Sequence, residues 1–186
     1  MPTLRVGAML LAAGSLFLGS SVGTGGAQAV GQSAKATLRD TSGATVGHVR
    51  LIQVGGAVVV RAEVRGVSPG FHGFHVHAVG ECIPPFTSAG GHYNPDATAH
   101  GDHAGDMPPL LVMDDGTASI RFETDGFAVT ELLDADGSAI IVHADRDNFA
   151  NIPTRYHSHT EDVFGPDSAT LATGDAGGRF ACGVIE

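Results

Sequence analysis

The densest group of potential metal ligands in the chain lies between Gly70 and Asp106. This stretch contains six of the ten histidines and one of the two cysteines. They are His72, His75, His77, His92, His100, His103 and Cys82. Imidazole is a good ligand for copper and zinc, and three histidines with one carboxylate complete a tetrahedral zinc set. The stretch therefore predicts a metal site.

A His-x-His motif opens this stretch. Successive side chains of a strand point to opposite faces, so His75 and His77 share one face while Phe74 and Val76 share the other. An isolated pair of this kind is more often hydrogen-bonded or solvated than bound to metal. Here three more histidines and the carboxylate of Asp106 follow, in a loop rich in Gly, Pro, Asp and Ala. Such a loop has little core of its own, and a metal ion could hold it together.

A second group of polar residues lies near the C-terminus. His143 ends an apolar segment, Asp147 follows four residues later, and Arg179 precedes the segment that contains Cys182. A lone histidine at the end of a strand is usually only a polar terminus. Together with a nearby carboxylate and guanidinium, it becomes a further candidate ligand.

Eight short segments are expected to form strands that position these residues. They are residues 34–40, 45–54, 57–64, 71–77, 110–114, 117–123, 139–143 and 180–185. They alternate in polarity or are continuously apolar, they are separated by turn residues, and no convincing amphipathic helix stands between them. Residues 129–133 could form a helical turn. The pattern predicts an all-β antiparallel sandwich or barrel.

Two long irregular segments, residues 79–109 and 144–178, follow the strands that carry the candidate ligands. Loops of this length in a compact domain are usually functional. If both leave the same end of the barrel, they meet over the histidines.

The first 29 residues have the features of a secretory signal peptide. Arg5 precedes an apolar run, and Ala27-Gln28-Ala29 matches an A-x-A cleavage site. A membrane anchor is the weaker alternative, because Gly and Ser interrupt the run. The expected organisation is a signal peptide over residues 1–29 and one domain over residues 30–186. The protein is expected to be exported to a periplasm or cell envelope, or secreted, with no membrane span after cleavage.

The charge of the mature chain indicates which partners it can have, and its cysteines are interpreted in the light of export. Without Arg5, nine basic residues remain against 20 acidic ones, a net charge of −11 that argues against nucleic acid as a partner. Two cysteines in an exported chain suggest one disulfide, between Cys82 and Cys182, rather than two buried thiols.

Four motifs in this order resemble the copper–zinc superoxide dismutase family, in its exported bacterial form. They are Gly70-Phe71-His72-Gly73-Phe74-His75-Val76-His77, Ser88-Ala89-Gly90-Gly91-His92-Tyr93-Asn94-Pro95, His143 with Asp147, and residues 174–185 around Arg179 and Cys182. The resemblance covers essentially the whole mature chain. It implies an eight-stranded Greek-key β-barrel, an immunoglobulin-like sandwich with two long functional loops.

The resemblance also implies a role for each site residue. Copper would be bound by His75, His77, His92 and His143, and zinc by His92, His100, His103 and Asp106, so that His92 is shared. Asp147 would hydrogen-bond one histidine of each metal, and Cys82 and Cys182 would form the family disulfide. Superoxide would be converted to dioxygen and hydrogen peroxide, with His92 carrying a proton and Arg179 docking the anion.

Two features depart from the family pattern. Only two residues separate His100 from His103, which makes zinc binding the less secure expectation. The second loop lacks the lysines of some relatives and instead carries Arg155, His157 and His159. We interpret His157-Ser158-His159 as mainly solvent-facing, with an auxiliary copper site as the minority alternative.

Several alternatives remain open from the sequence. An exported copper carrier would suit the clustered histidines, but it would not need a shared His92 or Arg179. A secreted β-sandwich with a zinc clip and a zinc hydrolase are weaker interpretations. The oligomeric state is open, a homodimer being one arrangement compatible with the sequence.

Overall fold

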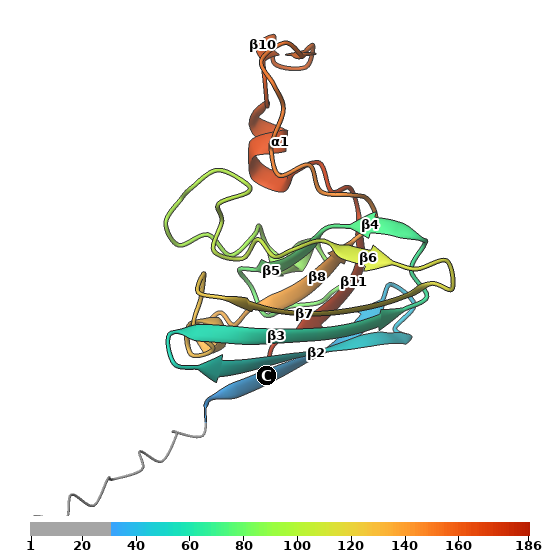
Figure 1. Ribbon diagram of the computed structural model, residues 1–186, viewed down its shortest axis with the longest axis vertical. Coiled ribbons are helices and arrows are strands. Elements are labelled where there is room, and N and C mark those ends of the chain that lie inside the picture. The colour runs from blue at the N-terminus through green and yellow to red at the C-terminus, as the bar shows by residue number, and fades with distance from the viewer. Residues whose placement is uncertain (1–30) are drawn as a thin grey trace, which may run out of the picture.

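The computed structural model describes residues 31–186, so the expected signal peptide lies outside the described residues (Figure 1). The strands are β1 (Ser33–Asp40), β2 (Thr45–Val54), β3 (Ala57–Arg65), β4 (Gly70–His72), β5 (Phe74–His77), β6 (Leu110–Val112), β7 (Thr117–Thr124), β8 (Ala139–His143), β9 (His157–Ser158), β10 (Val163–Phe164) and β11 (Arg179–Val184). The helical elements are α1 (Ser168–Thr173) and the 3-10 turns η1 (Thr87–Ala89) and η2 (Glu131–Leu133).

Seven strands form one antiparallel sheet in the order β5-β8-β11-β1-β2-β3-β7, and β4 pairs with β6. Strands β3 and β5 lie at different ends of this order although they are close in sequence, and β7 and β8 are likewise separated, as in a Greek key. The sheet curls so that β2, β3 and β7 form one layer and β5, β8 and β11 the other (Figure 1). The predicted all-β Greek-key fold is confirmed.

All eight expected strands are present, but the segment over residues 71–77 is divided into β4 and β5 at Gly73. A Cβ at Gly73 would lie 2.7 Å from the Cβ of Ala176 and 3.1 Å from Cε1 of His75. Real Cβ atoms essentially never come within 2.7 Å of another atom, so a glycine lets the second long loop pass against the start of β5. The expected helical turn at residues 129–133 is present as η2.

The apolar core lies between the two layers and fixes the strands that carry ligands. Every residue of β5 and β8 is buried, whereas β3 alternates between buried and exposed positions along most of its length. Phe74 and Val76 pack into the main core, which leaves His75 and His77 on the opposite face of β5. This is the arrangement that the alternation of the sequence predicts.

The two long loops lie on the same side of the sheet, above β5 and β8 (Figure 1). The backbone N–H of His100 in the first loop donates to the carbonyl oxygen of Leu171 in the second, over 2.7 Å. The second loop contains the β9–β10 pair and α1, which the sequence pattern does not predict. Asp167 caps α1 by accepting a hydrogen bond from the N–H of Thr170 at 3.0 Å.

A disulfide joins Cys82 to Cys182, with their Cα atoms 5.7 Å apart. It ties the beginning of the first long loop to β11, and the predicted pairing is confirmed. Within residues 31–186, none of the helical elements has the length and apolar character that crossing a membrane requires.

Candidate metal centre

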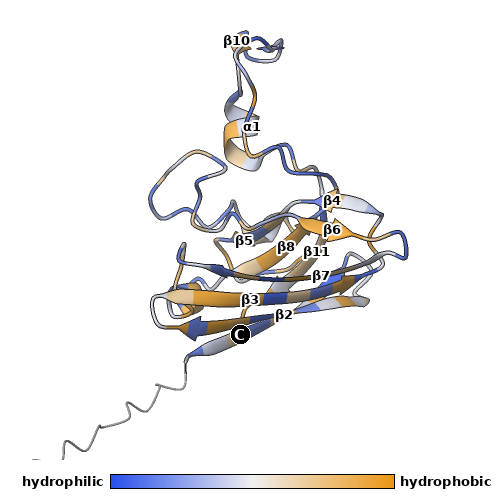
Figure 2. Cartoon of the chain, viewed as in Figure 1, coloured by the Kyte–Doolittle hydropathy of each residue, from blue (hydrophilic) through white to orange (hydrophobic). Residues whose placement is uncertain are grey.

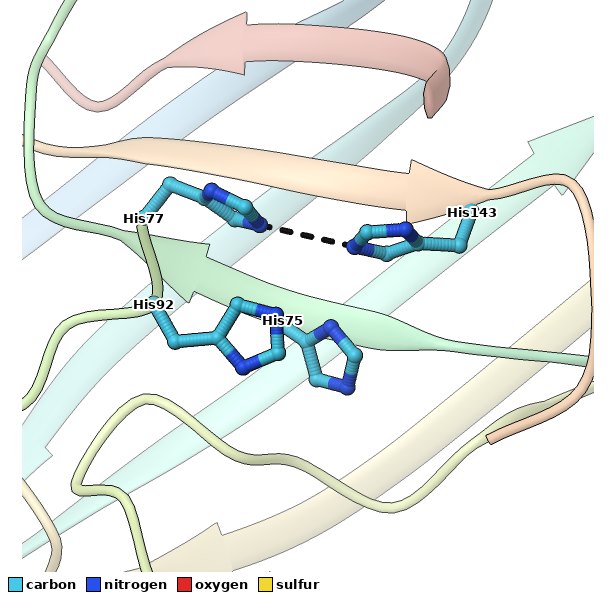
Figure 3. A group of neighbouring side chains, drawn as sticks. All are labelled: His75, His77, His92 and His143. Atoms are coloured by element: carbon cyan, nitrogen blue, oxygen red, sulfur yellow. Dashed lines mark hydrogen bonds between the residues drawn. The ribbon is translucent and has the colours of Figure 1, made fainter. Parts of the chain in front are cut away.

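Four buried histidines form the first ligand group. His75 and His77 come from β5, His143 from the end of β8, and His92 from the first long loop (Figure 3). One ring nitrogen from each lies within 4.8 Å of those of the others. The backbones of His77 and His92 form an isolated antiparallel bridge, which holds the loop against the strand. Strand pairing and a loop contact thus assemble the group.

Hydrogen bonds fix the orientation of three of these rings. His77 Nδ1 lies 3.0 Å from the carbonyl oxygen of Gly90, and His143 Nδ1 lies 3.3 Å from that of Gly177. His75 Nε2 lies 2.6 Å from Oδ2 of Asp147. Each acceptor favours the proton on the nitrogen that faces it, so the other nitrogen keeps its lone pair for a metal. The two remaining nitrogens of His77 and His143 face each other at 3.4 Å (Figure 3).

The second ligand group contains three histidines and one carboxylate. His92, His100, His103 and Asp106 bring one donor atom each within 4.8 Å of the others. Oδ1 of Asp106 lies 2.8 Å from Nδ1 of His92 and 3.4 Å from Nδ1 of His103, and Oδ2 lies 3.2 Å from Nδ1 of His100. Two residues between His100 and His103 are therefore enough for both rings to reach one carboxylate. His92 belongs to both groups, with Nδ1 on this side.

Asp147 connects the two groups. Its Oδ2 accepts from Nε2 of His75 and its Oδ1 accepts from Nε2 of His100, at 2.6 and 2.8 Å. The N–H of Phe149 also donates to Oδ1, at 2.7 Å, and fixes the carboxylate. A Cβ at Gly174 would overlap both Oδ1 of Asp147 and Nε2 of His100, and φ there is +59°. Gly174 is thus the residue that makes room for this bridge.

Burial and charge set the protonation of the ligands. Burial in this apolar site lowers the pKa of His75 to about 4 and that of His143 to about 3, so both rings are neutral near pH 7. Burial opposes charge on His100 as well, but Asp106 and Asp147 outweigh it and raise its pKa to about 9. Burial alone would raise the pKa of each carboxyl, yet their hydrogen bonds from histidines lower both below the usual range.

Two buried nitrogens show that the residues suit metal ions. Among residues 31–186, Nδ1 of His75 and Nδ1 of His100 are the buried side-chain polar atoms that make no hydrogen bond, although Oδ2 of Asp106 lies 3.2 Å from Nδ1 of His100. An unpaired buried polar atom is costly and rare in native proteins. Nδ1 of His75 belongs to the first group, and a metal ion there would give it a partner. In the second group a metal ion would take the place of the proton between Nδ1 of His100 and Asp106. Four imidazoles suit copper, and three histidines with one carboxylate suit zinc.

Arg179 lies beside the first group. A hollow of about 460 Å³ is lined by Arg179 and by His77, His92 and His143. The guanidinium donates to the carbonyl oxygen of Phe86 and, at 2.6 Å, to that of Gly90. Gly90 therefore accepts from both Arg179 and His77. Sequence patterns did not single out this carbonyl, because any residue type can supply one.

The remaining histidines of interest lie outside both groups. His72 is buried, and its ring nitrogens lie 2.9 Å from the carbonyl oxygen of His143 and 2.8 Å from that of Ser68. It therefore packs against the backbone of His143, outside both groups. His157 and His159 lie around β9, and Nε2 of His157 is 2.9 Å from Oδ1 of the exposed Asp162.

Known structures and sequences resemble the chain throughout this region. A relative from Mycobacterium tuberculosis, a copper–zinc superoxide dismutase, is 40% identical over 168 residues, covering 83% of this chain and 70% of the relative. One from Brassica juncea is 38% identical over 136 residues, covering 70% of this chain and 81% of the relative. A superoxide-dismutase-like protein from Bacillus subtilis, solved as a double mutant, has a TM-score of 0.64 and 28% identity, over 81% of this chain and 95% of that one.

The clock protein EA4 has a similar fold, with a TM-score of 0.66 and 27% identity, over 84% of this chain and 94% of that one. The family model for copper/zinc superoxide dismutase matches residues 45–185, which include every residue of both ligand groups, Asp147, Arg179 and both cysteines. The chain therefore belongs to the copper/zinc superoxide dismutase family.

Proposed function

We propose that His75, His77, His92 and His143 bind the copper ion of this superoxide dismutase, and that His92, His100, His103 and Asp106 bind its zinc ion. The observation that carries this assignment is the convergence of buried donor atoms into two groups that share His92, together with the unpartnered Nδ1 of His75. Asp147 supports it, because the carboxylate binds the outer nitrogen of one histidine from each group and leaves the inner nitrogen directed at its own ligand group.

The reaction converts two superoxide anions and two protons to dioxygen and hydrogen peroxide. Bound copper supplies a centre that takes up one electron and returns one, and zinc supplies fixed positive charge without redox chemistry. Among the protein groups, we assign His92 the task of holding and releasing one proton at Nε2. Asp106, whose Oδ1 lies 2.8 Å from Nδ1 of His92, would share the zinc ion with this ring and so help to fix its position.

Arg179 is the residue that we assign to anion docking. Its guanidinium lies in the hollow above His77, His92 and His143, and both of its terminal nitrogens are held by backbone carbonyls. The net charge of −11 beyond the signal peptide repels an anion at long range, but salt screens that field over about 8–10 Å at physiological ionic strength. A fixed local cation therefore decides whether superoxide stays in the hollow.

We propose that the protein is exported, which would place its protection against superoxide outside the cytoplasm. The disulfide is compatible with an oxidising compartment, and the first 29 residues have the pattern of a signal peptide. N-terminal sequencing of protein recovered from outside the cytoplasm should give residue 30 as the first residue; recovery of the uncleaved chain would contradict this.

A homodimer is a further proposal. Phe71 on β4 and Leu111 on β6 are directly paired, and with Met113 they expose apolar side chains at 56%, 52% and 57%. Burying these side chains against a second copy would remove apolar surface from water. Sedimentation should give the wild type twice the molecular mass of the Leu111→Glu variant. A monomeric mass for both proteins would contradict the proposal.

Replacing His143 with alanine tests the copper assignment. We expect the dismutation rate to fall by more than about 10²-fold, beyond the 10–100-fold typical of losing an outer partner of a ligand. Copper content should fall with it, while zinc content stays near one per chain because His143 is absent from the second group. The measurement is metal content by mass spectrometry together with the rate, with His157→Ala as the matched control. Loss of both metals, or a preserved rate, would contradict the assignment.

Replacing Arg179 with isoleucine tests anion docking. The second-order rate at low superoxide should fall about tenfold, which corresponds to about 1.4 kcal/mol, while copper content stays unchanged. Arg179→Lys keeps the charge without the planar fork, so we expect a smaller loss. Stopped-flow rates at several salt concentrations provide the measurement. A parental rate in the isoleucine variant would rule out the docking role.

The metal-free protein should lose stability as the pH falls from 7 to 5. In the unfolded chain histidine takes up a proton near pH 6.5, whereas burial keeps His75 and His143 neutral in the fold down to pH about 4 and about 3. Below pH 6.5 the unfolded state therefore binds more protons and is favoured, by up to about 1.4 kcal/mol per pH unit for each ring. His100 acts in the opposite sense: its contribution is present below pH 6.5 and is lost as the pH rises through about 9.

Urea denaturation of the metal-free protein at several pH values measures this slope. Metal-free His143→Gln should show a shallower slope between pH 7 and 5, because it lacks one of the buried rings. Equal stability of the metal-free wild type at pH 7 and pH 5 would show that the rings are not held neutral by burial.

A further inference from the structure

Four cationic side chains stand in direct register across four adjacent strands. Lys35 on β1 is paired with Arg50 on β2, Arg50 with Arg61 on β3, and Arg61 with Arg121 on β7. We call these four residues the cationic row. It contains four of the nine basic residues that follow the signal peptide, on a domain with a net charge of −11. Directly opposed residues of antiparallel strands share a face, so the four charges lie side by side.

The cationic row faces solvent on the layer remote from the metal centre. All four side chains are exposed, while their neighbours Ala34, Ala36, Val49, Val60 and Ala62 point into the core. Hydrophilic segments interrupt the apolar colouring near the middle of β2 and β3 (Figure 2). A hollow of about 530 Å³ lies here, lined by Lys35, Arg50 and Arg61 among others. The row therefore cannot be assigned to guiding superoxide towards His77 and His143.

The arrangement is unfavourable for the isolated protein. Like charges directly opposite one another destabilise a sheet. Lys35 has a carboxylate of Glu186 at 3.3 Å and Arg121 one of Glu123 at 3.6 Å, so the ends of the row are partly neutralised. Within residues 31–186, the central Arg50 and Arg61 have neither a carboxylate within 4.0 Å nor a hydrogen-bond acceptor for their guanidinium groups. Their charge is available to a partner.

We propose that the cationic row binds a linear phosphate polymer that carries no bases. Strands are spaced by about 4.8 Å, so four residues in register form a line of charge about 15 Å long. Arginine donates paired hydrogen bonds that match the oxygens of a phosphate group, and two arginines occupy the centre of the line. A flexible polyanion that lies along the hollow would contact Lys35, Arg50 and Arg61, and its continuation onto β7 would contact Arg121.

The surroundings of the row distinguish this partner from other polyanions. Glu63, Glu123 and Glu186 flank the row, so a flat anionic membrane would bring its headgroups against carboxylates, whereas a narrow chain would not. Single-stranded nucleic acid binds by stacking its bases on aromatic side chains as well as by charge. The positions that border the row on the same face are Thr37, His48, Glu63 and Ser119 on one side and Ser33, Ile52, Val59 and Glu123 on the other, and none is Phe, Tyr or Trp.

Binding of long-chain inorganic polyphosphate to the full mature protein tests the proposal. Labelled polymer is titrated with the protein, and its fluorescence anisotropy gives the binding constant K at salt concentrations between about 50 and 200 mM. Each phosphate contact releases about 0.7 counterion, so four contacts should give a slope of log K against log salt of about −3. Arg50→Gln with Arg61→Gln should halve this slope and weaken binding at low salt by at least tenfold. Arg39→Gln with Arg65→Gln is the matched control, because it also removes two positive charges, but from the C-terminal ends of strands β1 and β3 of the same sheet.

The dismutation rate of both double variants should equal that of the wild type, which shows that they fold. A parental affinity and slope in the Arg50/Arg61 variant, or an equal loss in the Arg39/Arg65 control, would overturn the proposal. Binding to anionic lipid vesicles or to single-stranded DNA that is as tight as binding to polyphosphate, and equally sensitive to Arg50 and Arg61, would overturn it too, in favour of those partners.

Discussion

The carboxylate of Asp147 is the contact on which the metal centre depends. Its two oxygens hold one imidazole from each ligand group, His75 and His100, and so fix the separation and orientation of two segments that are far apart in the sequence. Burying a carboxylate and several imidazoles away from water costs desolvation free energy. Hydrogen bonds to these polar atoms, and the metal ions that they could bind, offset this cost. Any side chain at Gly174 would overlap Asp147 and His100, so this contact requires glycine there.

The β-barrel turns this contact into a rigid site. Strands β5 and β8 are buried along their whole length, so three of the histidines sit on backbone that cannot move without disturbing the core. The disulfide attaches the first loop to β11, the strand that begins with Arg179. The loop in turn provides the carbonyl of Gly90, which orients both His77 and Arg179. The proposed metal binding and the proposed anion docking thus depend on the same loop and the same carbonyl.

Much of this could be predicted from the sequence, because alternation of polarity predicts strands and the family motifs carry the ligands. The parity of residues 74–77 correctly placed Phe74 and Val76 in the core and the two histidines on the other face of the strand. Other features depend on tertiary contacts that no local pattern encodes. The break at Gly73 follows from the close passage of Ala176, and the carbonyl of Gly90 acts through backbone. The short α1 and the β9–β10 pair have too few residues for a recognisable period.

The cationic row illustrates the same limit. Lys35, Arg50, Arg61 and Arg121 are unremarkable as separate residues on four strands, and only the register of the sheet places them in line. Register is set by the whole set of strand pairings and turns, so it becomes visible only in the folded structure.

The most direct test of the central claim is a crystal structure of the protein loaded with copper and zinc, with anomalous diffraction recorded at both absorption edges. The account predicts one copper peak and one zinc peak on opposite sides of the His92 ring, with Asp147 contacting neither metal. Two peaks that do not share His92, or a metal bound directly by Asp147, would contradict it.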